Sequence, residues 1–345
     1  MGLMVVGSQC LGYGLMFLAF WRAYPEVKIS WGSVGMATWK EMAGFGVSSL
    51  TVASGSLFLN QGPPVLIGRY LTEAYVGYYT VPARMLQHIV DMVTRIGYVT
   101  VPKTAELLAL GQRDKIVQLG VYINRYALAL FMPITIYLMF YGTTLVGIWL
   151  GKSFAQQSGA LIPVLVGAMA FAVAGQFNSS MILLGMGVHR LYSRSIVGEA
   201  LLLVAGMFLV LPRYGIFGAA CLALALMVIN RGLCTAMMVC YHLKVNYFTY
   251  MASIYVRPLA TAVPVAATVW WLKQGHWVTG RNWFELIGVG GTLAAVYLAL
   301  CFVTVLDPQY RVVLDSIAGK AAAAMGEREL EQLTQGVNFQ QGGGE

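Results

Sequence analysis

Charged side chains are scarce in this chain of 345 residues, where Asp, Glu, Lys and Arg together make up only 10% of the sequence. A soluble globular domain carries about 25%. Apolar residues account for 58%, and the mean hydropathy is +0.69 over the whole length. That is more apolar surface than one core can bury, so lipid must be the solvent for most of the chain. The composition therefore excludes a water-soluble globular protein.

Residues that bind metals or carry redox chemistry are also few. The five cysteines lie in or beside apolar runs and form no Cys-x-x-Cys pair, which indicates small packing residues. The four histidines show neither His-x-x-x-His nor Glu-x-x-His spacing, so we expect no metal site and no cofactor. Glycine-rich segments follow no P-loop pattern, no loop holds a Gly-x-Ser-x-Gly or Asp-x-Asp motif, and the acids of the loops are isolated. The sequence therefore predicts a protein that is not an enzyme.

Long apolar runs are what the chain has in quantity. A helix of about 20 apolar residues crosses the hydrocarbon core of a bilayer. Nine runs reach this length, and they predict an all-α fold: a polytopic membrane helix bundle of about nine transmembrane helices. We expect these helices near residues 2–21, 42–68, 75–101, 116–141, 157–186, 192–212, 215–241, 249–273 and 284–305.

The basic residues divide unevenly among the loops between these helices. Of the 22 lysines and arginines, we assign thirteen to one set of alternate loops with the adjoining helix ends and the C-terminal tail, five to the other set, and four to the interior of helices. In membrane proteins the cytoplasmic loops carry the excess of Lys and Arg. The sequence therefore predicts a multi-pass protein of the cytoplasmic (inner) membrane, with the N-terminus outside and the C-terminus inside. The same bias accounts for the net charge of +8, so no nucleic-acid partner is expected.

The third predicted helix carries four polar residues at intervals of four, three and four: Arg84, His88, Asp91 and Arg95. This spacing places all four on one helical face. Each charged side chain costs about 2.5–3.5 kcal/mol at the middle of a membrane, so the row is expected to line a hydrated cavity that attracts anions. The alternative is structural: Asp91 and Arg95 are four residues apart, and they would neutralise one another and lock the helix against a neighbour.

Polar residues inside other helices form a second group of candidates. Arg125 follows Asn124 in the fourth helix, and Arg231 follows Asn230 in the seventh. We expect the two arginines to extend the basic lining of the cavity, with interhelical hydrogen bonding as the alternative role for the whole group. The second helix holds a polar segment with two prolines at 60–64, which predicts either a broken helix beside a binding site or a simple kink. The other members of the group are Gln176, Asn178 and Glu199.

Short segments rich in Gly, Pro and aromatic residues follow one another between residues 40 and 245. They include Leu59-Asn60-Gln61, Ile67-Gly68 and Gly77-Tyr78-Tyr79 in the run that starts at Phe45, then Val101-Pro102, Leu183-Leu184-Gly185-Met186-Gly187, and Pro212-Arg213-Tyr214-Gly215-Ile216-Phe217-Gly218-Ala219-Ala220. This pattern resembles the second six-helix lobe of oligosaccharide flippases of the Wzx type, which belong to the multidrug/oligosaccharidyl-lipid/polysaccharide exporter superfamily.

The resemblance implies a domain organisation. Proteins of this type have twelve or fourteen helices in two six-helix lobes, so this chain is expected to hold one six-helix lobe plus flanking helices and to lack the family's first five helices. Residues 1–21 would be the last helix of the missing lobe, and 22–41 a cytoplasmic linker. The lobe would span 42–245, two additional helices 246–306, and a cytoplasmic tail 307–345. The uncharged start, without the basic flank and cleavage site of a signal peptide, agrees with a chain that begins part-way through a longer protein.

The resemblance also implies a function: a flippase that moves undecaprenyl-diphosphate-linked oligosaccharide across the cytoplasmic membrane for polysaccharide or O-antigen biosynthesis. The expected mechanism is alternating access through a cationic cavity, in which Arg84 and Arg95 attract the diphosphate, while His88 and Asp91 bind sugar or orient the arginines. The expected partners are the lipid-linked oligosaccharide, membrane lipid, a coupling ion (proton or sodium) and glycan polymerase machinery. Many relatives carry an acid near the position of Gln61, where this chain is neutral, which argues against coupling through that site.

Two other functions are consistent with the sequence. A multidrug or cation exporter of the same superfamily would use acidic groups within the helices, and only Asp91 and Glu199 occur there away from the helix ends. The second is an inactive truncated remnant, because a lone lobe lacks half of the cavity. A membrane-embedded polymerase would need a long periplasmic loop with ionisable residues, and no loop of this chain has that length.

Overall fold

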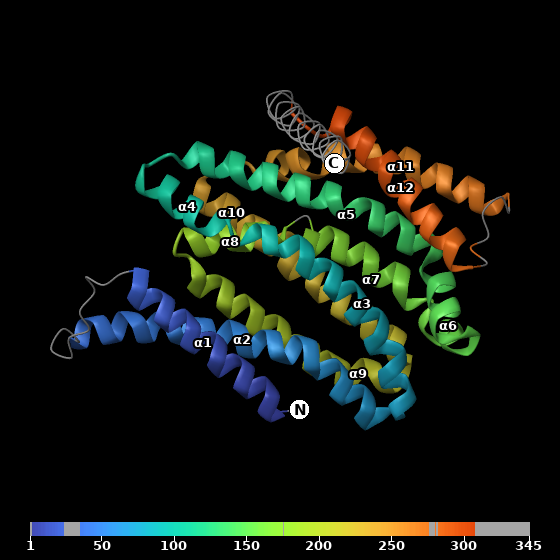
Figure 1. Cartoon of the computed structure of the whole chain (residues 1–345), viewed down its shortest axis with the longest axis horizontal. Helices are drawn as coiled ribbons and strands as arrows, with labels where there is room; N and C mark the ends of the chain where they lie inside the picture. The colour runs from blue at the N-terminus through green and yellow to red at the C-terminus, as the bar shows by residue number, and fades with distance from the viewer. Residues whose placement is uncertain (1, 24–34, 175, 276–279, 281, 308–345) are drawn as a thin grey trace, which may run out of the picture. The chain divides into compact units, whose positions relative to one another are not determined.

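Helices make up all of the regular secondary structure in the residues that the computed structural model describes, which are 2–23, 35–174, 176–275, 280 and 282–307. The chain divides into two compact units, residues 1–50 and residues 51–345. The first holds α1 (Gly2–Ala23), and α2 (Met36–Tyr70) begins in the first and ends in the second (Figure 1). The second continues with α3 (Glu73–Gly97), α4 (Thr100–Ala109), α5 (Arg113–Leu150), α6 (Lys152–Ser158), α7 (Leu161–Met169), η2 (Ala170–Ala174), α8 (Phe177–Gly185), α9 (His189–Met227), η3 (Val228–Cys234), α10 (Thr235–Leu243), α11 (Tyr247–Gln274) and α12 (Trp283–Thr304).

Several of these helices are suited to a lipid environment. Among the residues that the structure describes, four helical stretches are long and apolar enough to cross a membrane, and a pair bent by 54° adds a fifth if its halves form one span. No strand occurs in the part of the chain that the structure describes. The predicted all-α membrane helix bundle is thereby confirmed, while the number of nine spans stays a prediction. The four stretches are Arg113–Leu150, Arg190–Leu243, Tyr247–Gln274 and Trp283–Thr304, and the bent pair is Lys152–Ser158 with Leu161–Ala172.

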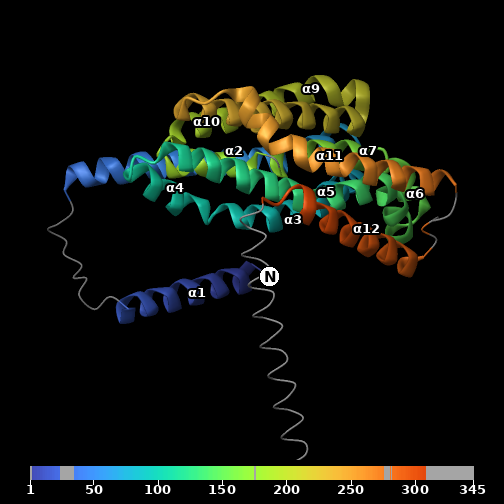
Figure 2. The same cartoon turned by 90° about the horizontal axis from the view of Figure 1, so that it is seen from above.

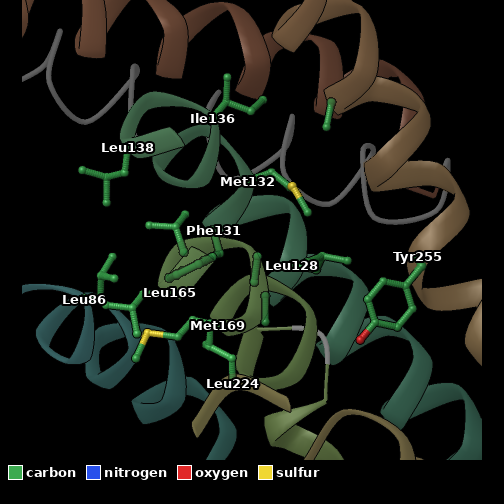
Figure 3. Packing of buried hydrophobic residues seen from close by; sticks show 14 of the residues in the cluster. Leu86, Leu128, Phe131, Met132, Ile136, Leu138, Leu165, Met169, Leu224 and Tyr255 are labelled. Carbon is green, nitrogen blue, oxygen red and sulfur yellow. The ribbon is translucent and has the colours of Figure 1, made fainter. Parts of the chain in front are cut away.

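The 38-residue helix α5 is the hub of the second unit. It contacts α6, α7 and α8 as well as α11 and α12, the two helices that lie beside it in Figure 2. Buried apolar side chains of α3, α5 and α7 form one cluster, in which Figure 3 shows Leu86, Phe131 and Leu165. Among lipids such packing rests on close van der Waals contact rather than on exclusion of water. The cluster therefore fixes α3, which carries the predicted polar row, against its neighbours.

Helix α9 contains a sharp turn at Gly215. The backbone there has φ +58° and ψ −152°, a conformation that residues with a Cβ rarely adopt. The two arms of α9 pack against each other closely, since a Cβ at Gly206 would lie 2.7 Å from a methyl group of Leu222. This turn confirms the predicted division into helices near 192–212 and 215–241. It also lets the chain fold back so that Arg231 reaches Glu199.

Two π-helical segments, η2 and η3, contact each other. Gly232 in η3 permits the approach, because a Cβ at that position would lie 2.8 Å from the ring of Phe171 in η2. The predicted single helix at 157–186 is divided: α6 ends at Ser158, and α7, η2 and α8 follow within this range. Such π segments distort the regular hydrogen bonding of a helix and are frequent at functional sites. Arg231 belongs to η3, so it lies within one of these distorted segments.

Close helix packing at Gly185 leads to a prediction about stability. A Cβ there would lie 2.7 Å from both the Cβ of Thr104 and the carbonyl oxygen of Val101, and the backbone of α4 cannot move aside cheaply. We expect Gly185→Ala to lower the free energy of unfolding by about 1–3 kcal/mol, the usual cost of overpacking. Unfolding of the purified protein in an SDS titration measures this change.

Gly198→Ala is the matched control, because no atom lies within 4 Å of a Cβ at that position of α9. Alanine inside a helix is expected to leave the free energy of unfolding unchanged or to raise it by about 0.5–1 kcal/mol. Equal effects of the two substitutions would contradict the tight contact between α4 and α8.

Candidate functional site

A polar cavity of about 360 Å³ lies within the second unit, between α2, α3, α7, α9 and η3. Its volume falls within the range of about 300–1,000 Å³ that is usual for small-molecule sites. Its wall combines charged, amide, hydroxyl and apolar side chains from segments that are far apart in the sequence. The polar members are Asn60, Gln61, Tyr79, Thr80, Arg84, Gln87, His88, Asp91, Glu199 and Arg231.

Helix α2 contributes its proline-containing segment to the wall. The helix continues through Pro63 and Pro64 to Tyr70, so the broken helix that the sequence suggested at 60–64 is not present. Proline has no N–H, and the carbonyls of Leu59 and Asn60 therefore lose their usual helical donors. Both of these residues and both prolines line the cavity. The uninterrupted helix thus still brings polar groups to the wall.

Helix α3 contributes three of the four residues of the predicted polar row. Arg84, His88 and Asp91 all line the cavity, which agrees with their shared helical face. Arg84 and His88 are exposed, and neither makes a hydrogen bond or an ion pair with any described residue. Asp91 is half-buried and accepts a hydrogen bond of 2.8 Å from Nε2 of Gln87. The side chain of Arg95 lies outside the described residues.

Arg231 reaches the same cavity from η3, and an ion pair holds it there. Its Nε lies 3.2 Å from the carboxylate of Glu199, whose side chain is only 3% exposed, whereas that of Arg231 is 33% exposed. Asn230 donates a 2.7 Å hydrogen bond to the same carboxylate. The interhelical hydrogen bonds considered for Glu199 and Asn230 are therefore present. Glu199 fixes Arg231 at the wall and leaves part of its guanidinium open to the cavity.

The formal charges of the described lining cancel. It holds two arginines and two carboxylates, together with one histidine counted as neutral at pH 7. In the described wall, Glu199 and Asp91 balance the two arginines. The cationic cavity that the sequence indicates stays a prediction, because it includes Arg95. Since Glu199 is engaged with Arg231, Arg84 is, among the described residues of the wall, the arginine with all of its donors available to a ligand.

Arg125 does not lie at this cavity. Its Nε donates a hydrogen bond of 2.8 Å to the carbonyl oxygen of Ser253 in α11, and its Nη1 lies 3.1 Å from a carboxylate oxygen of Asp307. The predicted extension of the basic lining is therefore made by Arg231 and not by Arg125. The partner Asp307 is 182 residues away in the sequence, so no local pattern could have indicated this pair.

A buried seam of polar side chains joins α5, α8 and α11. Asn124 donates a 2.9 Å hydrogen bond to the hydroxyl of Ser179, which lies 3.2 Å from the hydroxyl of Tyr250 and donates to Gln176. All four residues are buried. This is the interhelical role that the sequence left open for Asn124 and Gln176, and it makes the seam a structural contact between helices.

Gln87 and Thr80 line the cavity although the sequence did not point to them. Gln87 lies one turn before Asp91 on the same face, and Thr80 donates to the carbonyl oxygen of Val76 at 2.7 Å. Uncharged polar residues cost less to insert in a membrane than charged ones, so they are less conspicuous in a sequence. Within the described residues, no group of three His, Cys, Asp or Glu side chains is arranged to hold a metal ion.

Comparison with known proteins finds a match between part of this chain and one protein family. Residues 4–159 match the sequence model of a family described as "Polysaccharide biosynthesis protein". The match covers just under half of the chain, and it includes α2 and α3, which form two walls of the cavity. No curated protein and no solved structure gives a significant match. The likeness agrees with the resemblance found from the residue patterns, because both concern polysaccharide biosynthesis.

Proposed function

We propose that this chain is a transporter of the Wzx flippase type, which moves an undecaprenyl-diphosphate-linked oligosaccharide across the cytoplasmic membrane. Its similarity to a polysaccharide biosynthesis family supports a glycan as the cargo. Its long apolar helices support a membrane location. The observation that carries the proposal is the polar cavity, where Arg84 and His88 are exposed and have no partner among the described residues.

The diphosphate is assigned to the arginines. A guanidinium offers paired donors that match the oxygens of a phosphate group. Arg84 has its donors available, and Arg231 contributes a second contact from η3 while Glu199 holds it in place. By its spacing on α3, Arg95 would add a further cation on the same face.

The sugars are assigned to the remaining polar groups of the wall. A sugar hydroxyl both donates and accepts hydrogen bonds, so a glycan site needs both kinds of partner. The amides of Asn60, Gln61 and Gln87 offer both, and the carboxylate of Asp91 accepts. The two carboxylates in the described wall fit this cargo, since a purely cationic wall would suit the diphosphate alone.

In the proposed mechanism, helices rock about the cavity so that it opens to one side of the membrane and then to the other. The polyprenyl tail stays in the surrounding lipid while the diphosphate and sugars pass through. A coupling ion, proton or sodium, drives the cycle, and glycan polymerase machinery takes up the product. The N-terminus lies outside and the C-terminus inside, as the distribution of basic residues indicates.

A cation or multidrug exporter is the second candidate, because both acids that such a protein would use, Asp91 and Glu199, line the cavity. The surroundings of Glu199 weigh against it. Its carboxylate already accepts from Asn230 and pairs with Arg231, so a cationic substrate would have to displace an arginine.

A transport assay with the purified chain in liposomes tests the proposal. We expect the protein to bring a polyprenyl-diphosphate-linked oligosaccharide from the inner to the outer leaflet, where an added glycosidase can remove its sugars, faster than in protein-free vesicles. The same vesicles loaded with a cationic dye serve as the comparison. Efflux of the dye without movement of the glycan lipid supports the exporter and contradicts the flippase. A folded protein that moves neither substrate supports the inactive remnant.

A further inference from the structure

Arg125 does not line the cavity. It belongs instead to a second cluster of charged side chains. One carboxylate, that of Asp307, lies 3.1 Å from Nη1 of Arg125 and 2.7 Å from Nη1 of Arg257. Arg125 belongs to α5, Arg257 to α11, and Asp307 follows the end of α12. These three residues, called the Arg125 cluster below, therefore join three helices of the second unit.

The length of α12 places this cluster at a membrane surface. The helix has 22 residues, and at 1.5 Å per residue it is about 33 Å long, close to the thickness of about 30 Å of the hydrocarbon core. Its ends therefore lie near the two surfaces of the bilayer. Asp307 lies three residues beyond its C-terminal end, and a 2.7 Å hydrogen bond joins Thr304, the last residue of α12, to Thr261 of α11. We therefore expect the cluster at the depth of the lipid headgroups.

The cluster carries an excess positive charge, because two guanidiniums share one carboxylate. Within the described part of the chain, Asp307 is the acid that pairs with Arg125 and with Arg257. The side chain of Arg125 is only 8% exposed, whereas that of Arg257 is 49% exposed. Val256 and Leu259, on either side of Arg257 in the sequence, are exposed apolar residues of a membrane-spanning helix. The open part of Arg257 therefore lies among lipid-facing residues.

We propose that the Arg125 cluster binds the phosphate group of an anionic membrane lipid. Arg257 presents the donors that Asp307 does not use, and Arg125 supplies a second positive charge from the buried side. Arginine pairs with phosphate through two parallel hydrogen bonds, which strengthens the contact and gives it direction. None of the three residues lines the cavity, so this site does not depend on the proposed transport function.

Native mass spectrometry of the full chain tests the site with two lipids of equal chain length. The detergent-solubilised protein is mixed with equal amounts of phosphatidylglycerol and phosphatidylcholine, and the bound lipid is identified from the mass of the complex. We expect the wild-type protein to retain phosphatidylglycerol in preference, and Arg257→Gln to lower that retention about tenfold, because a charge-assisted contact is lost. Arg213→Gln is the matched control, since Arg213 is exposed and lies outside the cluster. It is expected to leave the lipid preference unchanged.

Asp307→Asn separates lipid binding from a merely structural role. Removing the carboxylate leaves two guanidiniums without their anion, so we expect the variant to retain more phosphatidylglycerol than the wild-type protein. A cluster that only pins helices together predicts lower stability with no gain in lipid binding. If the Asp307→Asn variant does not fold, the Arg257→Lys variant is tested in its place. Lysine keeps the charge but lacks the paired donors, so retention between those of the wild-type protein and Arg257→Gln is expected.

Equal retention of phosphatidylglycerol by the wild-type protein and Arg257→Gln would overturn the proposal. Inorganic phosphate alone provides the remaining comparison. Phosphate is added to lipid-stripped protein to measure its binding, and to the phosphatidylglycerol-bound protein to measure displacement of the lipid. If free phosphate both binds and displaces phosphatidylglycerol, the cluster is a site for a soluble anion, and the assignment to a membrane lipid is wrong.

Discussion

Replacing Arg84 with alanine is expected to lower transport of the lipid-linked oligosaccharide by about 10- to 100-fold and to leave the protein folded. A hydrogen bond to a charged group contributes about 1.5–3 kcal/mol, and each 1.4 kcal/mol is a factor of ten. The side chain of Arg84 is exposed at the cavity and has no partner among the described residues, so its removal costs ligand binding and not packing. The liposome assay measures the rate, and an SDS titration measures stability.

Two further variants make the Arg84 result specific. Arg84→Lys keeps the charge but loses the paired donors, so an intermediate rate is expected. Arg69→Ala removes an exposed arginine that does not line the cavity, and it is expected to transport at the wild-type rate. Wild-type transport by Arg84→Ala would refute the assigned role of this residue, even if the chain proves to be a flippase.

Replacing Glu199 with alanine is expected to lower the free energy of unfolding by about 2–3 kcal/mol. Removing one partner of a fully buried ion pair costs about 3–5 kcal/mol because the other charge stays buried and unpaired. The cost here is smaller because the side chain of Arg231 is one-third exposed. Asn230 loses its 2.7 Å hydrogen bond in the same variant. An SDS titration of the purified protein measures the change.

The exposed pair of Lys103 and Glu106 is the matched control for this second result. Its N–O distance is 2.8 Å, yet the side chains are 51% and 55% exposed. Surface pairs contribute about 0–1 kcal/mol, so Glu106→Ala is expected to have little effect. A double variant, Glu199→Gln with Arg231→Gln, is expected to be more stable than Glu199→Ala, because no charge is left unpaired. Equal stability losses for Glu199→Ala and Glu106→Ala would contradict a buried ion pair.

Composition and helical periodicity determined much about this protein without the structure. A chain with 10% charged and 58% apolar residues requires lipid as its solvent, and its apolar runs of about 20 residues predict the all-α membrane bundle. Arg84, His88 and Asp91 could be assigned to one cavity wall because residues three and four apart share a helical face whatever the surrounding fold. The turn at Gly215 was also predictable, since the chain interrupts its apolar run there with Pro212 and Arg213.

Arg125 and Arg231 show what the tertiary structure alone decided. Each follows an asparagine inside an apolar helix, so the sequence gives both the same interpretation. The structure separates them: Arg231 pairs with Glu199 at the cavity, and Arg125 pairs with Asp307 beside Arg257. Their partners lie 32 and 182 residues away, and those contacts depend on how helices fold back and pack. Periodicity fixes the face of a helix on which a residue lies, whereas the element that this face meets depends on the packing of the whole bundle.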